Sequence, residues 1–300
     1  MTITQSDKRK SRDPAVCQTV PRVVRIRNSG VHESLRTVQR LRASAYTRRM
    51  TSGRTKPAVF LCEDLDGNSA GEFVVKLRRG IDSGVVGLTC ELLSSLLAEK
   101  LGIRTPNPAI LEIDPAIGGL LSAGNAEMAR LIRNSGGLNF GSEVLVGGYS
   151  VWPIDKSVPA SLKPLAGEVF CFDALIQNPD RKLNNPNFLW KGDEVFLIDH
   201  ELAFSFLYQI GERADPWSLQ GSAGDFLNDH VFYRELKGQE IDLARFQNAL
   251  EAISDDELAE MIDQIPREWN NDSIAKISSH LKSVRDHAAE FVNQAKWRLA

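Results

Sequence analysis

The sequence contains few cysteines, and their spacing excludes two kinds of small stabilised domain. Four cysteines are spread along 300 residues, and no two of them form a Cys-x-x-Cys pair. Structural zinc sites and disulfide frameworks need closely and regularly spaced cysteines. We therefore expect the cysteines to be small core side chains, and the protein to work in the reducing cytoplasm.

Long apolar runs are also missing. No stretch approaches the roughly 20 apolar residues that a helix needs to cross a bilayer. The N-terminus carries charges without a following apolar segment, which a secretory signal would require. We expect neither a membrane span nor a signal peptide.

The phosphate loop Gly-x-x-x-x-Gly-Lys-Ser/Thr occurs nowhere in the chain. In P-loop NTPases this loop surrounds the phosphates with backbone N–H groups. Its absence counts against that class of nucleotide-binding protein.

Charge is unevenly distributed along the chain. Residues 1–56 hold 14 Lys and Arg against 3 Asp and Glu, whereas the remainder holds 22 against 36. Two interpretations stay open: a solvated basic arm held near its own acidic body, or a contact with nucleic acid, an acidic lipid surface or an acidic partner. The arm lacks interleaved aromatic residues for base stacking, which favours the first interpretation.

Apolar periodicity and turn residues predict a mixture of strands and helices. The expected strands are 57–63, 72–78, 109–113, 136–148, 187–190 and 195–198. The expected helices are 32–50, 85–101, 161–178, 242–253, 255–265 and 272–298, and 120–134 is expected to be a helix or a loop insertion. These elements indicate the α+β class, divided into a basic N-terminal arm with one docking helix (1–50), a β-rich part (51–147) and a mainly helical part (148–300).

The most informative stretch covers residues 178–200. A polar turn at 191–194 separates two apolar runs, which predicts a β-hairpin. Asn185 and Asn187 precede its first strand, and Asp199 follows its second, so folding the hairpin brings an acid and an amide together. Their oxygens suit Mg²⁺. Asp180 is then a second carboxylate nearby, available to accept a proton.

A second group of residues matches the phosphate-binding side of such a site. Lys76 lies within the strand expected at 72–78, and Glu91 lies near the start of the following helix. In protein kinases a strand lysine contacts the α- and β-phosphates and pairs with a glutamate of the next helix. Before these strands, a polar loop offers backbone N–H groups and cationic side chains to phosphate. Its residues are Gly53, Arg54, Thr55 and Lys56.

These motifs together resemble the HipA-like kinases, bacterial relatives of protein kinases with a distant likeness to phosphatidylinositol kinases. Asn178-Pro179-Asp180-Arg181 and Ile198-Asp199-His200 stand where ordinary protein kinases have His-Arg-Asp and Asp-Phe-Gly. The resemblance covers about residues 50–300. It implies a bilobal protein-kinase-like fold, with a small β-rich N-lobe and a mainly helical C-lobe that carries the catalytic hairpin at 178–200.

The resemblance also implies an activity and a role for each residue. The chain is expected to transfer the γ-phosphate of ATP to a hydroxyl, as a Ser/Thr protein kinase with ATP and Mg²⁺. Asp180 is expected to be the base, Lys76 and Glu91 to hold the phosphates, and Asp199 with Asn187, or alternatively Asn185, to hold the metal. Backbone groups of the hinge are expected to bind adenine. The hinge residues are Glu143, Val144, Leu145 and Val146.

Two residues beside the hairpin allow more than one role. Arg181 either stabilises the transferring phosphoryl group or forms a salt bridge within its own loop. His200 either points into the cleft or is a structural histidine, and the structural role is favoured.

Two alternatives to a protein kinase stay open. The same machinery serves a small-molecule kinase that acts on a sugar, a lipid or an antibiotic. The missing His-Arg-Asp triplet also allows a catalytically silent scaffold, although the retention of Lys76, Asp180 and Asp199 argues against it.

Overall fold

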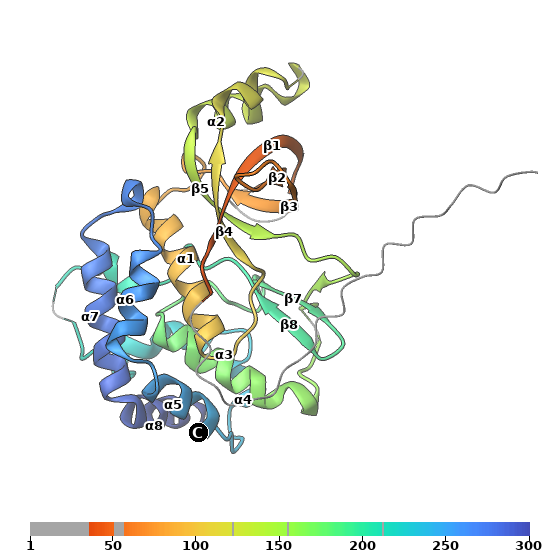
Figure 1. The fold of residues 1–300 in the computed structure, drawn as a ribbon. Helices are drawn as coiled ribbons and strands as arrows, with labels where there is room; N and C mark the ends of the chain where they lie inside the picture. The colour runs from red at the N-terminus through yellow and green to blue at the C-terminus, as the bar shows by residue number, and fades with distance from the viewer. Residues whose placement is uncertain (1–35, 51–56, 122, 155, 212) are drawn as a thin grey trace, which may run out of the picture. The chain divides into compact units, whose positions relative to one another are not determined.

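Five strands of the first half of the chain close into a barrel (Figure 1). The computed structural model describes residues 36–50, 57–121, 123–154, 156–211 and 213–300. The strands pair in the order β1-β2-β3-β5-β4, where β1 and β4 are parallel and all other neighbours are antiparallel. They are β1 (Gln39–Arg49), β2 (Ala58–Glu63), β3 (Ser69–Lys76), β4 (Pro108–Ile113) and β5 (Gly137–Glu143).

The strands expected at 57–63 and 72–78 are confirmed as β2 and β3, which pair with each other as a hairpin. Their register places Phe60 opposite Phe73, and both rings are buried in the barrel core. The turn forms because the Asp64 carboxylate accepts the N–H groups of Asp66 and Asn68, and because Gly67 adopts a φ of 87°. This turn sets where β3 begins, and β3 ends at Lys76, which lies in the candidate site described below.

The helix expected at 32–50 is wrong, because residues 39–49 form strand β1. Leu41 and Ala43 face the barrel interior while Arg40 and Arg42 face outward, which is the two-residue period of a strand. Irregularities in the pairing with β2 then shift the alternation between residues 43 and 45 and again between 46 and 48. Such bulges break a strict alternation, and the resulting three- and four-residue steps resembled a helix. The basic segment thus supplies a barrel strand.

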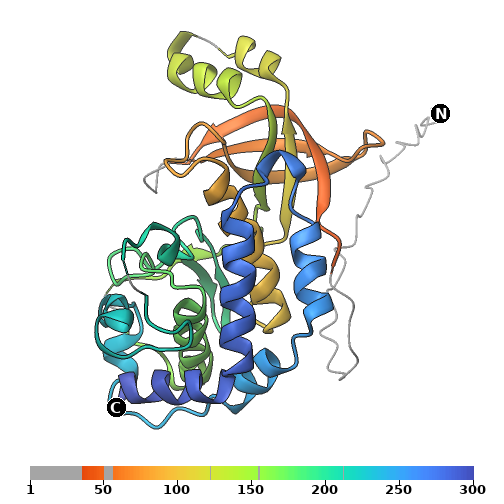
Figure 2. The ribbon, with the colours of Figure 1, turned by 90° about the vertical axis from the view of Figure 1, so that its left-hand side faces the viewer.

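Helix α1 (Val85–Lys100) confirms the helix expected at 85–101. It is buried almost all round, because it packs between the barrel and the later helices α6 (Asp255–Asp263) and η6 (Arg267–Trp269) (Figure 2). Gly102, with a φ of 73°, lets the chain turn back after the helix. The barrel has its own core, closed at one end by α2 (Ala126–Asn134) and the short helix η1 (Pro115–Gly119), while α1 belongs to the core of the helical part.

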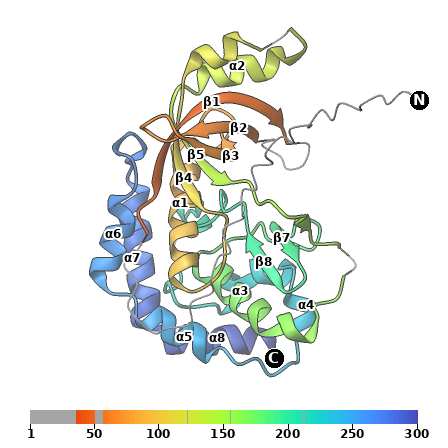
Figure 3. The same cartoon turned by 45° about the vertical axis from the view of Figure 1, so that its right-hand side comes forward.

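Most of the second half is helical, with one small sheet. The hairpin expected at 187–198 is confirmed as β7 (Phe188–Lys191) and β8 (Glu194–Leu197), and β6 (Ser150–Val151) adds a third strand beside β7 (Figure 3). The remaining elements are η2 (Ala123–Asn125), η3 (Ala160–Leu162), α3 (Lys163–Leu175), η4 (Ser205–Tyr208), η5 (Gly221–Asp229), α4 (Tyr233–Leu236), α5 (Ala244–Glu251), α6 (Asp255–Asp263), η6 (Arg267–Trp269), α7 (Ser273–Asp286) and α8 (Ala288–Leu299).

The single long helix expected at 272–298 is two helices. The chain breaks at His287, whose ring stacks on Trp217 at a centroid distance of 3.5 Å and whose Nδ1 lies 2.9 Å from the Ser283 carbonyl oxygen. Neither glycine nor proline marks this break, so no local residue pattern predicts it.

The architecture is of the mixed α and β class, as expected. Cys62, Cys90 and Cys171 are buried and free, which agrees with their expected place in the core. None of the helices in the described ranges has both the length and the apolar character needed to cross a bilayer. The division into an arm, a β-rich part and a helical part stays a prediction, except that β1 belongs to the barrel.

A buried ionic network fixes the chain that follows α3. Arg181 is 1% exposed, and its Nε lies 2.5 Å from Asp173 Oδ2. His230 Nε2 lies 3.0 Å from the same oxygen. Burial raises the pKa of Asp173, but Arg181 and His230 outweigh burial and lower it to about 2. Asp173 therefore anchors this segment through its contacts with Arg181 and His230.

We predict that Asp173→Ala lowers the free energy of unfolding by about 3–5 kcal/mol, because it leaves the Arg181 charge buried and unpaired. Urea denaturation at pH 7 measures this. The exposed Asp263→Ala is the matched control and should change stability by less than about 0.5 kcal/mol. Since the folded pKa of Asp173 lies below its ordinary value of 3.8, the wild type should lose this contribution as the pH falls from about 4 to about 2. Equal stability of the two variants would contradict the prediction.

Candidate active site

Lys76 lies at the centre of a buried cluster of three carboxylates. Its Nζ is 2.5 Å from Glu91 Oε1, 2.5 Å from Asp199 Oδ1 and 3.3 Å from Glu201 Oε2. Lys76 is the last residue of β3, Glu91 lies in the second turn of α1, and both acidic residues at 199 and 201 follow β8. Residues separated by more than 100 positions thus meet, as the kinase-type order of motifs predicted.

The charges of this cluster stabilise one another. Burial alone lowers the pKa of Lys76, but the carboxylates of Glu91, Asp199 and Glu201 outweigh burial and raise it. Burial likewise raises the pKa of Glu91, and the Lys76 ammonium lowers it overall. At neutral pH Lys76 is therefore a fixed cation and Glu91 a fixed anion. One ammonium facing three acids leaves an excess of negative charge.

Asp180 lies beside two asparagine amides. Its Oδ2 accepts hydrogen bonds from Asn185 Nδ2 at 2.9 Å and from Asn187 Nδ2 at 3.0 Å. Burial, and after it the Asp199 carboxylate, raise the pKa of Asp180 above its ordinary value. Because each amide donates its N–H to Asp180, each keeps its carbonyl oxygen available for another partner.

The β7–β8 hairpin and Arg181 place these groups. Arg181 donates to the backbone carbonyl oxygen of Asn187, and the Ile198 N–H donates to the same oxygen at 3.0 Å. Asn187 and Asp199 both adopt left-handed backbone conformations, with φ of 51° and 62°. Non-glycine residues in this region are uncommon and occur where surrounding contacts hold them. Of the two roles open to Arg181, the structure shows a salt bridge, but its partner Asp173 belongs to helix α3 and not to the loop of Arg181.

A cavity of about 450 Å³ extends from the Lys76 cluster and the two asparagines to the segment after β5. Asp180 does not line it. This volume lies within the usual range for small-molecule sites. The residues expected at the site that line it are Lys76, Glu91, Glu143, Val144, Leu145, Asn185, Asn187 and Asp199.

The hinge is only partly as expected. Val146 is 85% exposed and does not line the cavity. The N–H groups of Glu143 and Val144 donate to the carbonyl oxygens of Asn107 and Glu72, so neither is free for a base. Gly53, Arg54, Thr55 and Lys56 lie outside the described residues.

Two residues near the cluster add to what the sequence predicted. Glu201 was not expected at the site; it is 3% exposed, and burial raises its pKa, opposed by Lys76. An acid within the otherwise apolar run 201–207 was the available signal. His200 is fully buried, is among the residues that line the cavity, and has its Nδ1 3.8 Å from Glu91 Oε2.

The donor set suits Mg²⁺ bound together with phosphates. Among the described residues no group of three or more His, Cys, Asp or Glu side chains forms a metal cage. Mg²⁺ commonly uses one or two carboxylates and takes its other ligands from water and substrate phosphates. Asp199 and the Asn187 or Asn185 amide oxygen meet that requirement, and the excess negative charge around Lys76 favours a cation.

Comparison with known proteins gives a family match over most of the chain and remote likenesses to solved structures. The model of the HipA-like kinase family matches residues 44–300. The crystal structure of the Helicobacter pylori proinflammatory kinase CtkA is 13% identical, with a TM-score of 0.39, over 85% of this chain and 95% of that one.

The complex of Neurospora crassa PAN2 with PAN3 (pseudokinase and C-terminal region) is 12% identical, with a TM-score of 0.28, over 90% of this chain and 67% of that one. Both TM-scores are too low for either likeness to inform the fold or activity of this chain. No curated protein matches the chain.

We predict that Lys76→Met lowers the free energy of unfolding by about 3–5 kcal/mol, because Glu91 then stays buried without a counter-charge. The double variant Lys76→Met/Glu91→Gln should regain most of that loss. Urea denaturation of both variants measures the coupling. Lys296→Met, which removes an exposed lysine of α8, is the control. Additive effects of the two substitutions would contradict the ionic role of Lys76.

Proposed function

Because this chain belongs to the HipA-like kinase family, we propose that it transfers the γ-phosphate of ATP to a hydroxyl group, with Mg²⁺ as the metal. The observation that carries the proposal is the Lys76 ammonium, held 2.5 Å from both Glu91 and Asp199 in a cavity that also contains Asn187. A cation fixed beside a metal-binding acid is the arrangement that phosphoryl transfer needs, since this reaction depends on positioning and charge neutralisation.

Each residue has a role in this proposal. Lys76 neutralises the α- and β-phosphates, and Glu91 keeps its ammonium in place. Asp199 and Asn187, or alternatively Asn185, hold the metal. Bound Mg²⁺ neutralises charge on the phosphates. The barrel and the helical part then correspond to the N-lobe and C-lobe of a bilobal kinase.

Asp180 accepts the proton of the attacking hydroxyl. Its raised pKa suits a group that must take up a proton, and the two asparagine amides fix the direction of its Oδ2. Arg181 acts indirectly, since it is buried and orients the backbone of the hairpin.

A Ser or Thr of a protein is the acceptor we propose. A basic-arm contact with an acidic partner or nucleic acid, and a cytoplasmic location, stay predictions. The experiments that follow distinguish this proposal from its two alternatives, a small-molecule kinase and a catalytically silent scaffold.

We predict that ATP–Mg²⁺ stabilises the protein by about 2.7 kcal/mol at 100 times its dissociation constant. Thermal unfolding with and without the ligand measures this stabilisation. The Asp199→Ala variant should show a much smaller shift, because it lacks the carboxylate that we assign to the metal, whereas Asp263→Ala should shift like the wild type. No shift of the wild type at millimolar ATP–Mg²⁺ would favour the scaffold.

We predict that Asp180→Asn lowers the rate of phosphoryl transfer by about 10²–10⁴-fold, the usual contribution of a positioned base. Radiolabelled ATP measures transfer, and the thermal shift with ATP–Mg²⁺ should persist. The wild-type rate should fall on the acidic side as the pH drops through the raised pKa of Asp180, since only the carboxylate accepts a proton. Asp263→Asn is the control. An undiminished rate of phosphoryl transfer in Asp180→Asn would show that Asp180 is not the base.

A further inference from the structure

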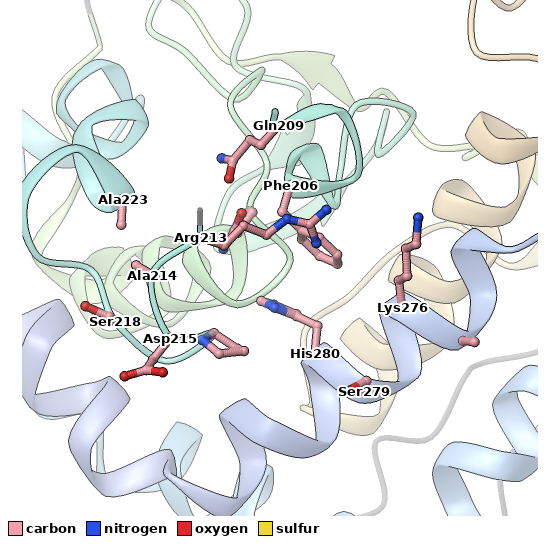
Figure 4. Close-up of a pocket in the computed structure, with 13 residues that line it drawn as sticks. Phe206, Gln209, Arg213, Ala214, Asp215, Ser218, Ala223, Lys276, Ser279 and His280 are labelled. Carbon is pink, nitrogen blue, oxygen red and sulfur yellow. The ribbon is translucent and has the colours of Figure 1, made fainter. Parts of the chain in front are cut away.

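A second cavity of about 380 Å³ lies between α7 and the segment that follows η4 (Figure 4). Helix α7 contributes Lys276, Ser279 and His280 to one wall. The opposite wall comes from Phe206, from residues 213–216 and from Ser218. Gln177 joins them from the segment that leads to Asp180. None of the described residues that line this cavity also lines the cavity around Lys76.

Two cations in this pocket have no acidic partner among the residues that the structure describes. Within those ranges neither Arg213 nor Lys276 forms an ion pair or a side-chain hydrogen bond, whereas Lys282 and Arg285 of the same helix both pair with Asp255. Asp215 is the one acid among the lining residues. The pocket therefore carries a net positive charge.

The floor of the pocket is neutral and orients Arg213. The Arg213 guanidinium carbon lies 5.6 Å from the centre of the Phe206 ring, which stacks on His280 at 4.5 Å. Figure 4 shows the Arg213 side chain extending over Phe206 with His280 beside it. Burial, and after it Arg213, lower the pKa of His280 to about 4, so this histidine is uncharged at neutral pH. An aromatic ring thus holds the guanidinium while its N–H donors stay free, a geometry suited to an oxyanion.

The pocket is tied to the segment that carries Asp180. Phe204 N donates to the Ile176 carbonyl oxygen at 2.5 Å, and Ser205 Oγ donates to that of Gln177 at 2.9 Å. Gln177 lies three residues before Asp180, a separation that a chain spans in at most about 11 Å. Gln177 also lines the pocket. An extended peptide whose hydroxyl reaches Asp180 therefore places another of its residues near the pocket, a few positions along the peptide from that hydroxyl.

We propose that this pocket binds an oxyanion-bearing side chain of the protein acceptor, a carboxylate or a phosphate within about four residues of the hydroxyl presented to Asp180. The inference rests on the proposed function and narrows it, because it names the class of acceptor. Arg213 and Lys276 are the residues that recognise the anion. The kinase then selects acidic or already phosphorylated sequences.

Degenerate Ser/Thr peptides test this, with Ala, Glu or phosphoserine fixed in turn at each of the four positions on either side of the acceptor. The measured quantity is the kcat/KM for the Glu or phosphoserine peptide relative to that for the Ala peptide. For the wild type this ratio should reach about tenfold at one position, equal to about 1.4 kcal/mol. It should fall to near one in Arg213→Ala/Lys276→Ala and stay unchanged in Arg234→Ala, which removes an exposed arginine of α4. A higher ratio for phosphoserine than for Glu assigns the site to phosphate, and similar ratios assign it to carboxylates.

Two results would overturn the inference while leaving the proposed function in place. One is phosphorylation of peptides by the wild type without preference for an anion, and the other is a preference that survives in the double variant. If the wild type binds ATP but phosphorylates no peptide, the protein-directed function fails instead. Fluorescence anisotropy of labelled peptides then tests anion binding by the pocket without any need for catalysis. Binding of anionic peptides that the double variant loses supports the inference, and equal binding by both proteins overturns it.

Discussion

One buried ammonium group holds the site together. Lys76 ends a barrel strand, Glu91 belongs to a helix of the other core, and Asp199 and Glu201 follow the hairpin of the small sheet. An ammonium in the interior is tolerated only when carboxylates surround it. The barrel, α1 and the hairpin must therefore all be in place before Lys76 is stable, so the correctness of the fold and the completeness of the site depend on the same contacts.

A second buried cation fixes the opposite side of the site. Arg181 bonds to Asp173 within the helical core and donates to the backbone of the hairpin residue Asn187. Its charge orients the chain that carries Asp180 and the asparagines without entering the cavity. The two cations have different roles. Lys76 faces the space where phosphates would bind, and Arg181 holds the surrounding backbone in place.

The sequence predicted the elements that neighbouring residues determine, and the site residues whose order along the chain is characteristic of a kinase. Strands β2 and β3 and the β7–β8 hairpin were predicted because turn residues separate apolar runs. Lys76, Glu91 and Asp199 were predicted to meet because their order is that of a kinase. Strand β1 was missed because its bulges hide the alternation. Glu201 was missed because nothing local requires an acid there; its place follows from Lys76, 125 residues away. The break at His287 likewise depends on a distant partner, Trp217.

The closure of the barrel limits how another protein approaches that end of the molecule. Strand β1 pairs with β4 on one side and β2 on the other, so the sheet has no free edge along the paired residues. An extended peptide adds to a sheet only where a strand leaves its backbone groups unpaired. Along these paired residues, recognition must therefore use side chains and loops, which lets sequence changes alter the choice of partner while the hydrogen-bonded framework stays the same.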